Sequence, residues 1–135
     1  MRRVLFDTNV LLDVLLEREP HYAASTAAFD LVGRDRIEGL VAAHAVTTLD
    51  YLLARRVGAR RSRQILATLL SKMRVASVTD SVVRTALASR ITDFEDAVCD
   101  AAATEAGADA IVTRNLADFA RATTLAMLPE ALSED

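Results

Sequence analysis

Cysteine, tryptophan and lysine are almost missing from this sequence of 135 residues. Cys99 is the single cysteine, so no disulfide can form within the chain, and we expect it to be buried and inert. Aromatic residues make up only 4%, which predicts a mainly aliphatic core. The first residues do not resemble a signal peptide, and no apolar run is long enough to span a bilayer. We therefore expect a protein of the reducing cytoplasm with no membrane attachment.

Hydrophobic residues, in contrast, make up 52% of the chain, and charged residues make up 26%. This balance is typical of a folded domain, and the length predicts one domain over residues 1–135. The net charge of −3 argues weakly against a nucleic-acid partner. Nearly all the basic residues are arginine, however, and the guanidinium group binds phosphate bidentately.

Five of the arginines crowd one short segment: Arg55, Arg56, Arg60, Arg61 and Arg63. These arginines could form an ordinary solvated helix surface, or they could form a surface that binds RNA.

Apolar runs and turn residues predict alternating strands and helices. The expected strands are 2–6, 38–42, 74–78, 110–113 and 123–128. The expected helices are 9–17, 20–31, 44–56, 59–73, 80–89 and 93–106. This alternation predicts an α/β fold with a short central parallel sheet covered by helices on both faces. In such sheets the ligand site lies beyond the carboxyl ends of the strands. Polar side chains follow two of the strands at that edge, namely Asp7, Arg114, Asn115 and Asp118.

Asp7 directly follows an apolar strand, where a charged group is costly unless it has a partner. It could simply cap the next helix, or it could bind a cation. Three further aspartates favour the cation. At about 100° per residue, Asp93, Asp96 and Asp100 fall within a roughly 60° arc of one helix that contains no basic residue. A capping role explains Asp93 and Asp96 but not Asp100. A bound dication would relieve the repulsion between all three.

Oxygen ligands without clustered cysteine or histidine favour Mg²⁺ or Mn²⁺ over zinc. Such an ion can activate a water and neutralise charge during phosphodiester cleavage. The residues therefore predict a metal-dependent site in a cluster of carboxylates that consists of Asp7, Asp93, Asp96, Asp100 and Asp118.

Three motifs together resemble the PIN-domain family, and most closely its VapC toxins. These are Val4–Asp13 (VLFDTNVLLD), Asp93–Ala97 (DFEDA) and Ile111–Phe119 (IVTRNLADF). The resemblance covers nearly the whole chain. It implies a Rossmann-like sheet, a Mg²⁺-dependent endoribonuclease, a cognate antitoxin of the VapB type that holds it inactive, and commonly a homodimer. It also implies that Asp7 and Asp96 are the main metal ligands, and that Asp7, Asp96 and Asp118 are the catalytic carboxylates. Asp118, Asp100 and Asp93 are further candidate ligands. Thr8, Asn9, Arg114 and Asn115 would support the ligands or position RNA. Helices near the arginine segment often meet the antitoxin in this family, which is a competing use for those residues.

Two positions depart from the family pattern. Asn115 stands where many members place another acidic residue. Many members carry a glutamate on the third helix where this chain has Thr48. Asp50 is two residues away, about 200° around the helix, and so points elsewhere. His44 shares the face of Thr48 and could be a metal ligand, a substrate contact or a helix-start residue. The missing carboxylate motivates an alternative in which the domain has lost cleavage and only binds RNA or protein.

A second alternative is a haloacid-dehalogenase-type phosphatase, whose opening motif Leu5–Asp13 also resembles. That family needs an aspartate where Asn9 stands and a well-placed lysine, for which Lys72 is the sole candidate.

Overall fold

The computed structural model describes residues 1–134. Its centre is a parallel sheet of five strands in the order β3-β2-β1-β4-β5. The strands are β1 (Arg3–Phe6), β2 (Glu38–Ala42), β3 (Met73–Ala76), β4 (Ala110–Val112) and β5 (Ala126–Met127). The side chains of Val4, Leu5, Phe6 and the whole of β4 are buried, as expected for central strands covered on both faces. The predicted α/β fold is confirmed.

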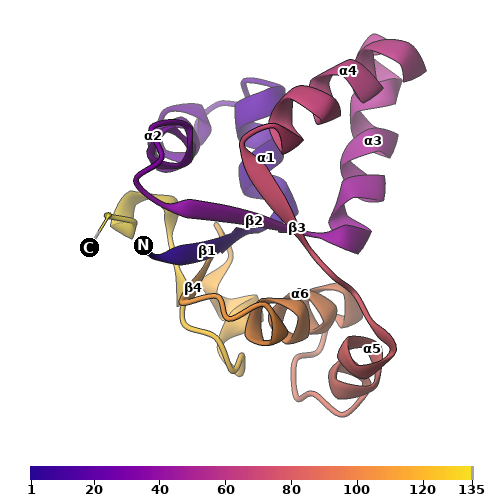
Figure 1. Cartoon of the computed structure of the whole chain (residues 1–135), viewed down its shortest axis with the longest axis vertical. Coiled ribbons are helices and arrows are strands. Elements are labelled where there is room, and N and C mark those ends of the chain that lie inside the picture. The colour runs from indigo at the N-terminus through magenta and orange to yellow at the C-terminus, as the bar shows by residue number, and fades with distance from the viewer. Residues whose placement is uncertain (135) are drawn as a thin grey trace.

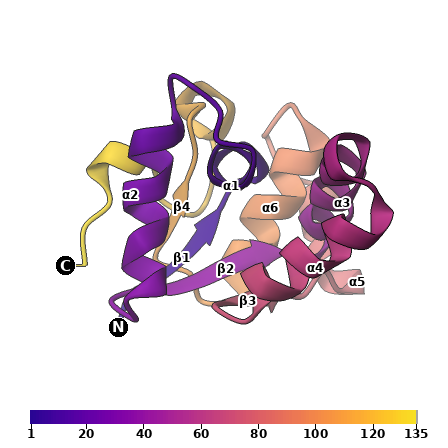
Figure 2. The ribbon, with the colours of Figure 1, turned by 90° about the horizontal axis from the view of Figure 1, so that it is seen from above.

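Six α-helices cover this sheet: α1 (Thr8–Leu15), α2 (Tyr22–Gly33), α3 (Ala43–Val57), α4 (Ala59–Leu70), α5 (Asp80–Leu87) and α6 (Phe94–Glu105). Figure 1 shows α1 and α2 with the α3–α4 hairpin on one side of the strands, and α6 with α5 on the other. Seen from above, α6 runs beside β1 and β4 (Figure 2). Two short 3₁₀ helices, η1 (Leu116–Phe119) and η2 (Pro129–Ala131), flank β5.

Local sequence signals explain where the helices begin and end. Asp7, Thr79 and Asp93 are the N-caps of α1, α5 and α6, and each side chain accepts a backbone N–H of the first turn. Gly58, with φ of 88°, separates α3 from α4. Gly107, with φ of 73°, follows the last turn of α6.

Most expected elements lie within a few residues of the observed ones, and β2 coincides with its prediction. The expected helix 59–73 is too long, because α4 ends at Leu70 and Met73 already belongs to β3, where it pairs with Gly39. The second helix begins at Tyr22 rather than at Pro20. The predicted strand 123–128 forms pairs only over Ala126–Met127. Among residues 1–134, no helix has the length and apolar character that crossing a membrane requires.

Candidate metal centre

Asp7 lies at the carboxyl end of β1, in the middle of the sheet. Its Oδ1 accepts the backbone N–H of Thr8 at 2.8 Å, and its Oδ2 accepts the hydroxyl of Thr113 at 2.9 Å. Its own N–H donates to the carbonyl of Val112 at 2.9 Å, which ties it to β4. The carboxylate therefore caps α1 and also has a fixed orientation at the edge of the sheet. Both roles that the sequence left open are compatible with this position.

Burial raises the pKa of Asp7, and the bonds from Thr113 and Thr8 and the charge of Arg114 oppose this rise. Asp118 adds to the rise. Burial and a second carboxylate both favour the neutral form of Asp7. A nearby cation would favour the ionised form and so stabilise a carboxylate at this position.

The beginning of α6 brings further carboxylates to the same edge. Asp93 caps the helix through a 3.0 Å bond from the backbone N–H of Asp96 to its Oδ1. Asp96 is half-buried, and burial together with the charges of Asp7, Asp93, Asp118 and Glu95 raises its pKa to about 7. These four neighbours come from the end of β1, the start of α6 and η1. The charge of Arg114 partly offsets this accumulation of negative charge at Asp7.

The loop after β4 supplies Asp118. The side-chain amide of Asn115 donates to Asp118 Oδ2 at 2.6 Å, and the backbone N–H of Asn115 donates to Thr113 Oγ1 at 3.1 Å. Because the Thr113 hydroxyl in turn donates to Asp7, the loop and the first carboxylate are connected through one residue. Thr113 was not among the predicted site residues, although a polar side chain at the end of a buried strand is a signal that could have identified it.

Asp100 faces a different part of the molecule. It is buried, and its two carboxylate oxygens accept the backbone N–H groups of Thr123 and Thr124, each at 2.9 Å. These bonds attach α6 to the segment before β5 and account for the charge on this helix face. We therefore leave Asp100, and the capping residue Asp93, out of the proposed ligand set.

His44 begins α3 beside α6. Its Nε2 lies 3.3 Å from the backbone oxygen of Glu95 and 3.6 Å from the sulfur of Cys99. Through these contacts His44 connects the start of α3 to the first turns of α6. Thr48 lies one turn further along α3 and is half-buried, while Asp50 accepts the hydroxyl of Ser62 at 2.7 Å and belongs to the contact with α4. Cys99 is buried, as predicted, and burial raises the pKa of its thiol far above the usual range.

A buried ion-pair cluster that the prediction missed lies next to this edge. Asp13 is fully buried, with 0% side-chain exposure, and it pairs with both Arg18 and Arg114. Arg18 also donates to the backbone oxygen of Asn9 at 3.1 Å, and Ser25 donates to Asp13 Oδ2 at 2.9 Å. The signal in the sequence was a charged residue inside the apolar stretch of α1, at a position where burial demands a partner.

The donor set can be compared with what a metal requires. Within residues 1–134, no group of three or more carboxylate, imidazole or thiol side chains is arranged to hold a metal ion. Mg²⁺ is commonly held by only one or two carboxylates together with waters and substrate phosphates. Asp7 and Asp96 offer such oxygens, and the side-chain oxygen of Thr8 is buried with no hydrogen-bond partner among the described residues. The chemistry therefore fits an open magnesium site rather than a closed cage.

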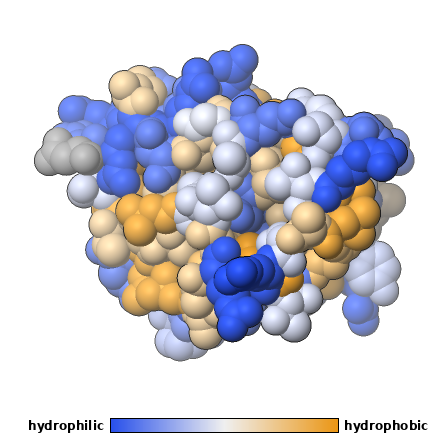
Figure 3. All heavy atoms as spheres, turned by 90° about the horizontal axis from the view of Figure 1, so that it is seen from below, coloured by the Kyte–Doolittle hydropathy of each residue, from blue (hydrophilic) through white to orange (hydrophobic). Residues whose placement is uncertain are grey.

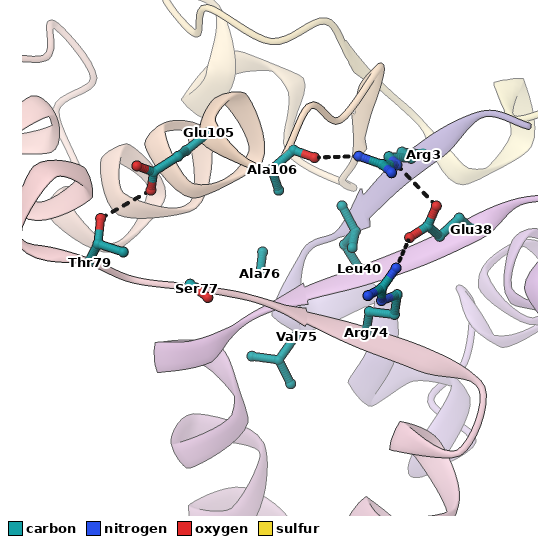
Figure 4. A pocket seen from close by; sticks show the side chains of 10 residues that line it. All are labelled: Arg3, Glu38, Leu40, Arg74, Val75, Ala76, Ser77, Thr79, Glu105 and Ala106. Atoms are coloured by element: carbon teal, nitrogen blue, oxygen red, sulfur yellow. Dashed lines mark hydrogen bonds and ion pairs between the residues drawn. The ribbon is translucent and has the colours of Figure 1, made fainter.

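A cavity of about 420 Å³ lies at the opposite end of the sheet and has a different character (Figure 4). In this cavity Glu38 bonds both Arg3 at 3.0 Å and Arg74 at 3.2 Å, and Glu105 accepts from the Thr79 hydroxyl at 3.0 Å. None of the candidate ligands lines this cavity, so the acidic edge remains the candidate site.

The parallel sheet and its acidic carboxyl edge define an α/β domain of Rossmann-like type with a carboxylate-rich site. A family model of the PIN domain matches residues 3–117, so the chain belongs to the PIN-domain family. The predicted family is confirmed, and the match favours it over the phosphatase alternative. The comparison with curated proteins finds no match.

Solved structures with the same fold include toxins of toxin–antitoxin systems. VapBC2 from Rickettsia felis, bound to a DNA fragment from its promoter, gives a TM-score of 0.72 at 14% identity, over 93% of this chain and 98% of that one. A toxin–antitoxin complex from Klebsiella pneumoniae gives 0.72 at 20% identity, over 93% and 97%. VapC20 from Mycobacterium tuberculosis, a sarcin–ricin loop cleaving toxin, gives 0.63 at 20% identity, over 80% and 86%. At these identities the likeness shows a shared fold.

Proposed function

We propose that this PIN domain is a Mg²⁺- or Mn²⁺-dependent endoribonuclease and the toxin of a VapBC-type pair. The observation that carries the proposal is the gathering of carboxylates around Asp96 at one sheet edge, where burial together with the charges of Asp7, Asp93, Asp118 and Glu95 raises its pKa to about 7. A cluster of this kind, in this family, is best explained by a cation that is bound there during function.

In this proposal Asp7 and Asp96 hold the metal directly, and Asp118 supports it. A bound Mg²⁺ would supply an activated water and neutralise charge on the phosphate under attack. Thr113 and the N–H of Thr8 keep the Asp7 carboxylate in one orientation, and Asn115 does the same for Asp118. Such fixed orientation lets a carboxylate act without a reorganisation cost.

The remaining residues of the set would position substrate. Asn9 is exposed two residues after Asp7, and Arg114 is half-buried directly after Thr113. His44 joins the starts of α3 and α6 and would act through the placement of Asp96. Thr48 offers a hydroxyl where the family pattern has a carboxylate, which favours a second candidate function, a PIN domain that binds RNA or protein without cutting.

An antitoxin and a second copy of the chain are the proposed protein partners, and the cytoplasm, where RNA and an antitoxin would meet it, is the proposed location. Figure 3 shows hydrophobic patches among polar side chains on the side of the molecule that carries α5 and α6. Val83, Leu87 and Phe94 of these helices are exposed, and exposed apolar residues of this kind favour a protein interface. The five arginines around Gly58 are also exposed and stay candidates for RNA or antitoxin contact.

The test is RNA cleavage by the purified protein with Mn²⁺, with Mg²⁺ and with a chelator. We expect cleavage that the chelator abolishes and that Asp7→Asn and Asp96→Asn lower by roughly 100-fold or more. Asp30→Asn is the matched control, because Asp30 lies on α2 in an exposed ion pair with Arg34 and should not affect the rate.

Intact RNA under every metal condition, from a protein that still binds its antitoxin, would favour the binding module instead. Cleavage that continues in the chelator would contradict the metal-dependent mechanism.

A further inference from the structure

Two arginines share one buried carboxylate beside the acidic edge. Arg18 Nη2 lies 3.1 Å from Asp13 Oδ1, and Arg114 Nε lies 2.8 Å from Asp13 Oδ2. Among residues 1–134, Ser25 is the only other side chain bonded to Asp13, and it is neutral. Two guanidinium groups and one carboxylate leave one positive charge in excess at this place.

The same contacts hold both arginines close to the candidate ligands. Arg114 directly follows Thr113, whose hydroxyl donates to Asp7. Arg18 donates to the backbone oxygen of Asn9 at 3.1 Å and to its side-chain oxygen at 3.3 Å, and Asn9 is two residues from Asp7. The excess charge is thus fixed beside the acidic edge, on the segments that follow α1 and β4.

Both arginines remain partly exposed to solvent. The side chain of Arg18 is 33% exposed and that of Arg114 is 28% exposed, whereas Asp13 is fully buried. A guanidinium group has five donors in a planar fork, so each arginine can bond Asp13 inward and still offer N–H groups outward. Asp13 is rigid because it is buried, and it therefore orders both forks in advance of any ligand.

We propose that Arg18 and Arg114, held by Asp13, form a phosphate subsite that binds an RNA phosphate next to the one that is cut. This inference rests on RNA as the proposed substrate. An acidic edge alone repels a polyanion, and a fixed positive charge beside it gives the neighbouring phosphate a place to bind. Asp13 is a positioning residue in this scheme, because it acts only through the two arginines.

The test measures binding rather than cleavage. In an Asp7→Asn background, which prevents cutting, the affinity for a short fluorescein-labelled single-stranded RNA is measured by anisotropy over a range of NaCl concentrations. Arg18→Ala and Arg114→Ala should each weaken binding roughly tenfold, and each should lower the slope of log Kd against log salt by about 0.7. Arg114→Lys should keep the salt slope, because lysine keeps the positive charge. It should lose part of the RNA affinity, because lysine lacks the planar set of donors that binds phosphate bidentately.

Each single variant leaves Asp13 with its other arginine, so the buried carboxylate keeps a partner and the domain should fold. Arg34→Ala on α2 is the matched control and should change neither affinity nor slope, since this exposed arginine only pairs with Asp30. Far-ultraviolet circular dichroism melts verify the fold of every variant.

The outcomes separate this inference from the nuclease proposal. Arginine-dependent RNA binding without cleavage by the unmodified protein would support the subsite and contradict the nuclease. Unchanged RNA affinity and slope in folded Arg18→Ala and Arg114→Ala would overturn the subsite, whatever the cleavage result. Loss of antitoxin binding with RNA binding intact would overturn it too, because the arginines would then serve a protein contact.

Discussion

At the scale of single residues, Asp96 and Asp100 lie about one turn apart on α6 and have opposite surroundings. Asp100 satisfies two backbone N–H groups, and Asp96 faces other carboxylates. We predict that Asp100→Ala lowers the free energy of unfolding by about 2 kcal/mol, because two backbone donors lose their acceptor, while Mg²⁺ affinity stays unchanged. Urea unfolding and calorimetric Mg²⁺ titration measure the two effects.

Asp96→Asn is the matched comparison and should show the reverse, with weakened Mg²⁺ binding and no loss of stability in the metal-free protein. If Asp100→Ala weakened Mg²⁺ binding as much as Asp96→Asn, Asp100 would have to return to the ligand set.

The same pair shows how far sequence could predict the site. Helical spacing placed both aspartates on one face of the helix. It could not show that Asp96 lies at the sheet edge while Asp100, one turn later, already contacts the 119–124 segment. Asp13 was missed for a related reason. Its partners Arg18 and Arg114 are 5 and 101 residues away, and only the packed fold brings them together.

At the scale of elements, β2 packs closely against α2 at Gly39. A Cβ atom placed there would lie 2.9 Å from Val32 Cγ2 and 3.3 Å from Met73 Cε. We predict that Gly39→Ala lowers the free energy of unfolding by roughly 1–3 kcal/mol, because the strand or the helix must shift. Urea unfolding checks this value.

Gly33→Ala near the end of α2 is the control, since no atom lies within 4 Å of its added Cβ. That change should stabilise the protein by up to about 1 kcal/mol, through the lower helix propensity of glycine. An unaltered stability for Gly39→Ala would show that α2 can move away from the strand at little cost.

The helices and strands were predicted better than the site, because apolar periodicity and capping residues are local signals. Asp7 and Asp93 lie at helix starts, where the sequence already allowed a capping role for each. The boundary between α4 and β3 was predicted less well, since only pairing of Met73 with Gly39 decides it.

At the scale of the whole molecule, the order of the strands in the sheet determines which residues meet at the candidate site. β1 lies between β2 and β4, so Asp7 is adjacent to the loop after β4 and to the helix start after β2. Alternating strands and helices predicted a parallel sheet and a site at its carboxyl edge. They did not predict which strands are neighbours, because that order depends on long-range pairing.

The charge gathered at this edge makes the stability of the whole domain depend on pH and on metal. Burial and neighbouring carboxylates raise the pKa of Asp96 from its ordinary 3.8 to about 7. Folding therefore takes up a proton between these values, and the contribution of Asp96 to stability is complete below the lower pKa and is lost as pH rises through about 7. Asp7 shifts in the same direction. Mg²⁺ requires the ionised form, so it should stabilise the domain above pH 7 and have little effect in acid.

Thermal melts of the natural chain and of Asp96→Asn, each with chelator and with Mg²⁺, test this dependence. In chelator the variant should melt at the higher temperature above pH 7, where the natural chain carries an unrelieved charge, and the difference should vanish toward pH 3.8. With Mg²⁺ above pH 7 the order should reverse, because only the natural chain offers Asp96 to the ion. The difference between the two proteins removes the titration of groups that do not interact with Asp96. A difference that stays constant with pH in chelator would show that Asp96 is not destabilised by its acidic neighbours, and the electrostatic reason for a cation at this edge would be lost.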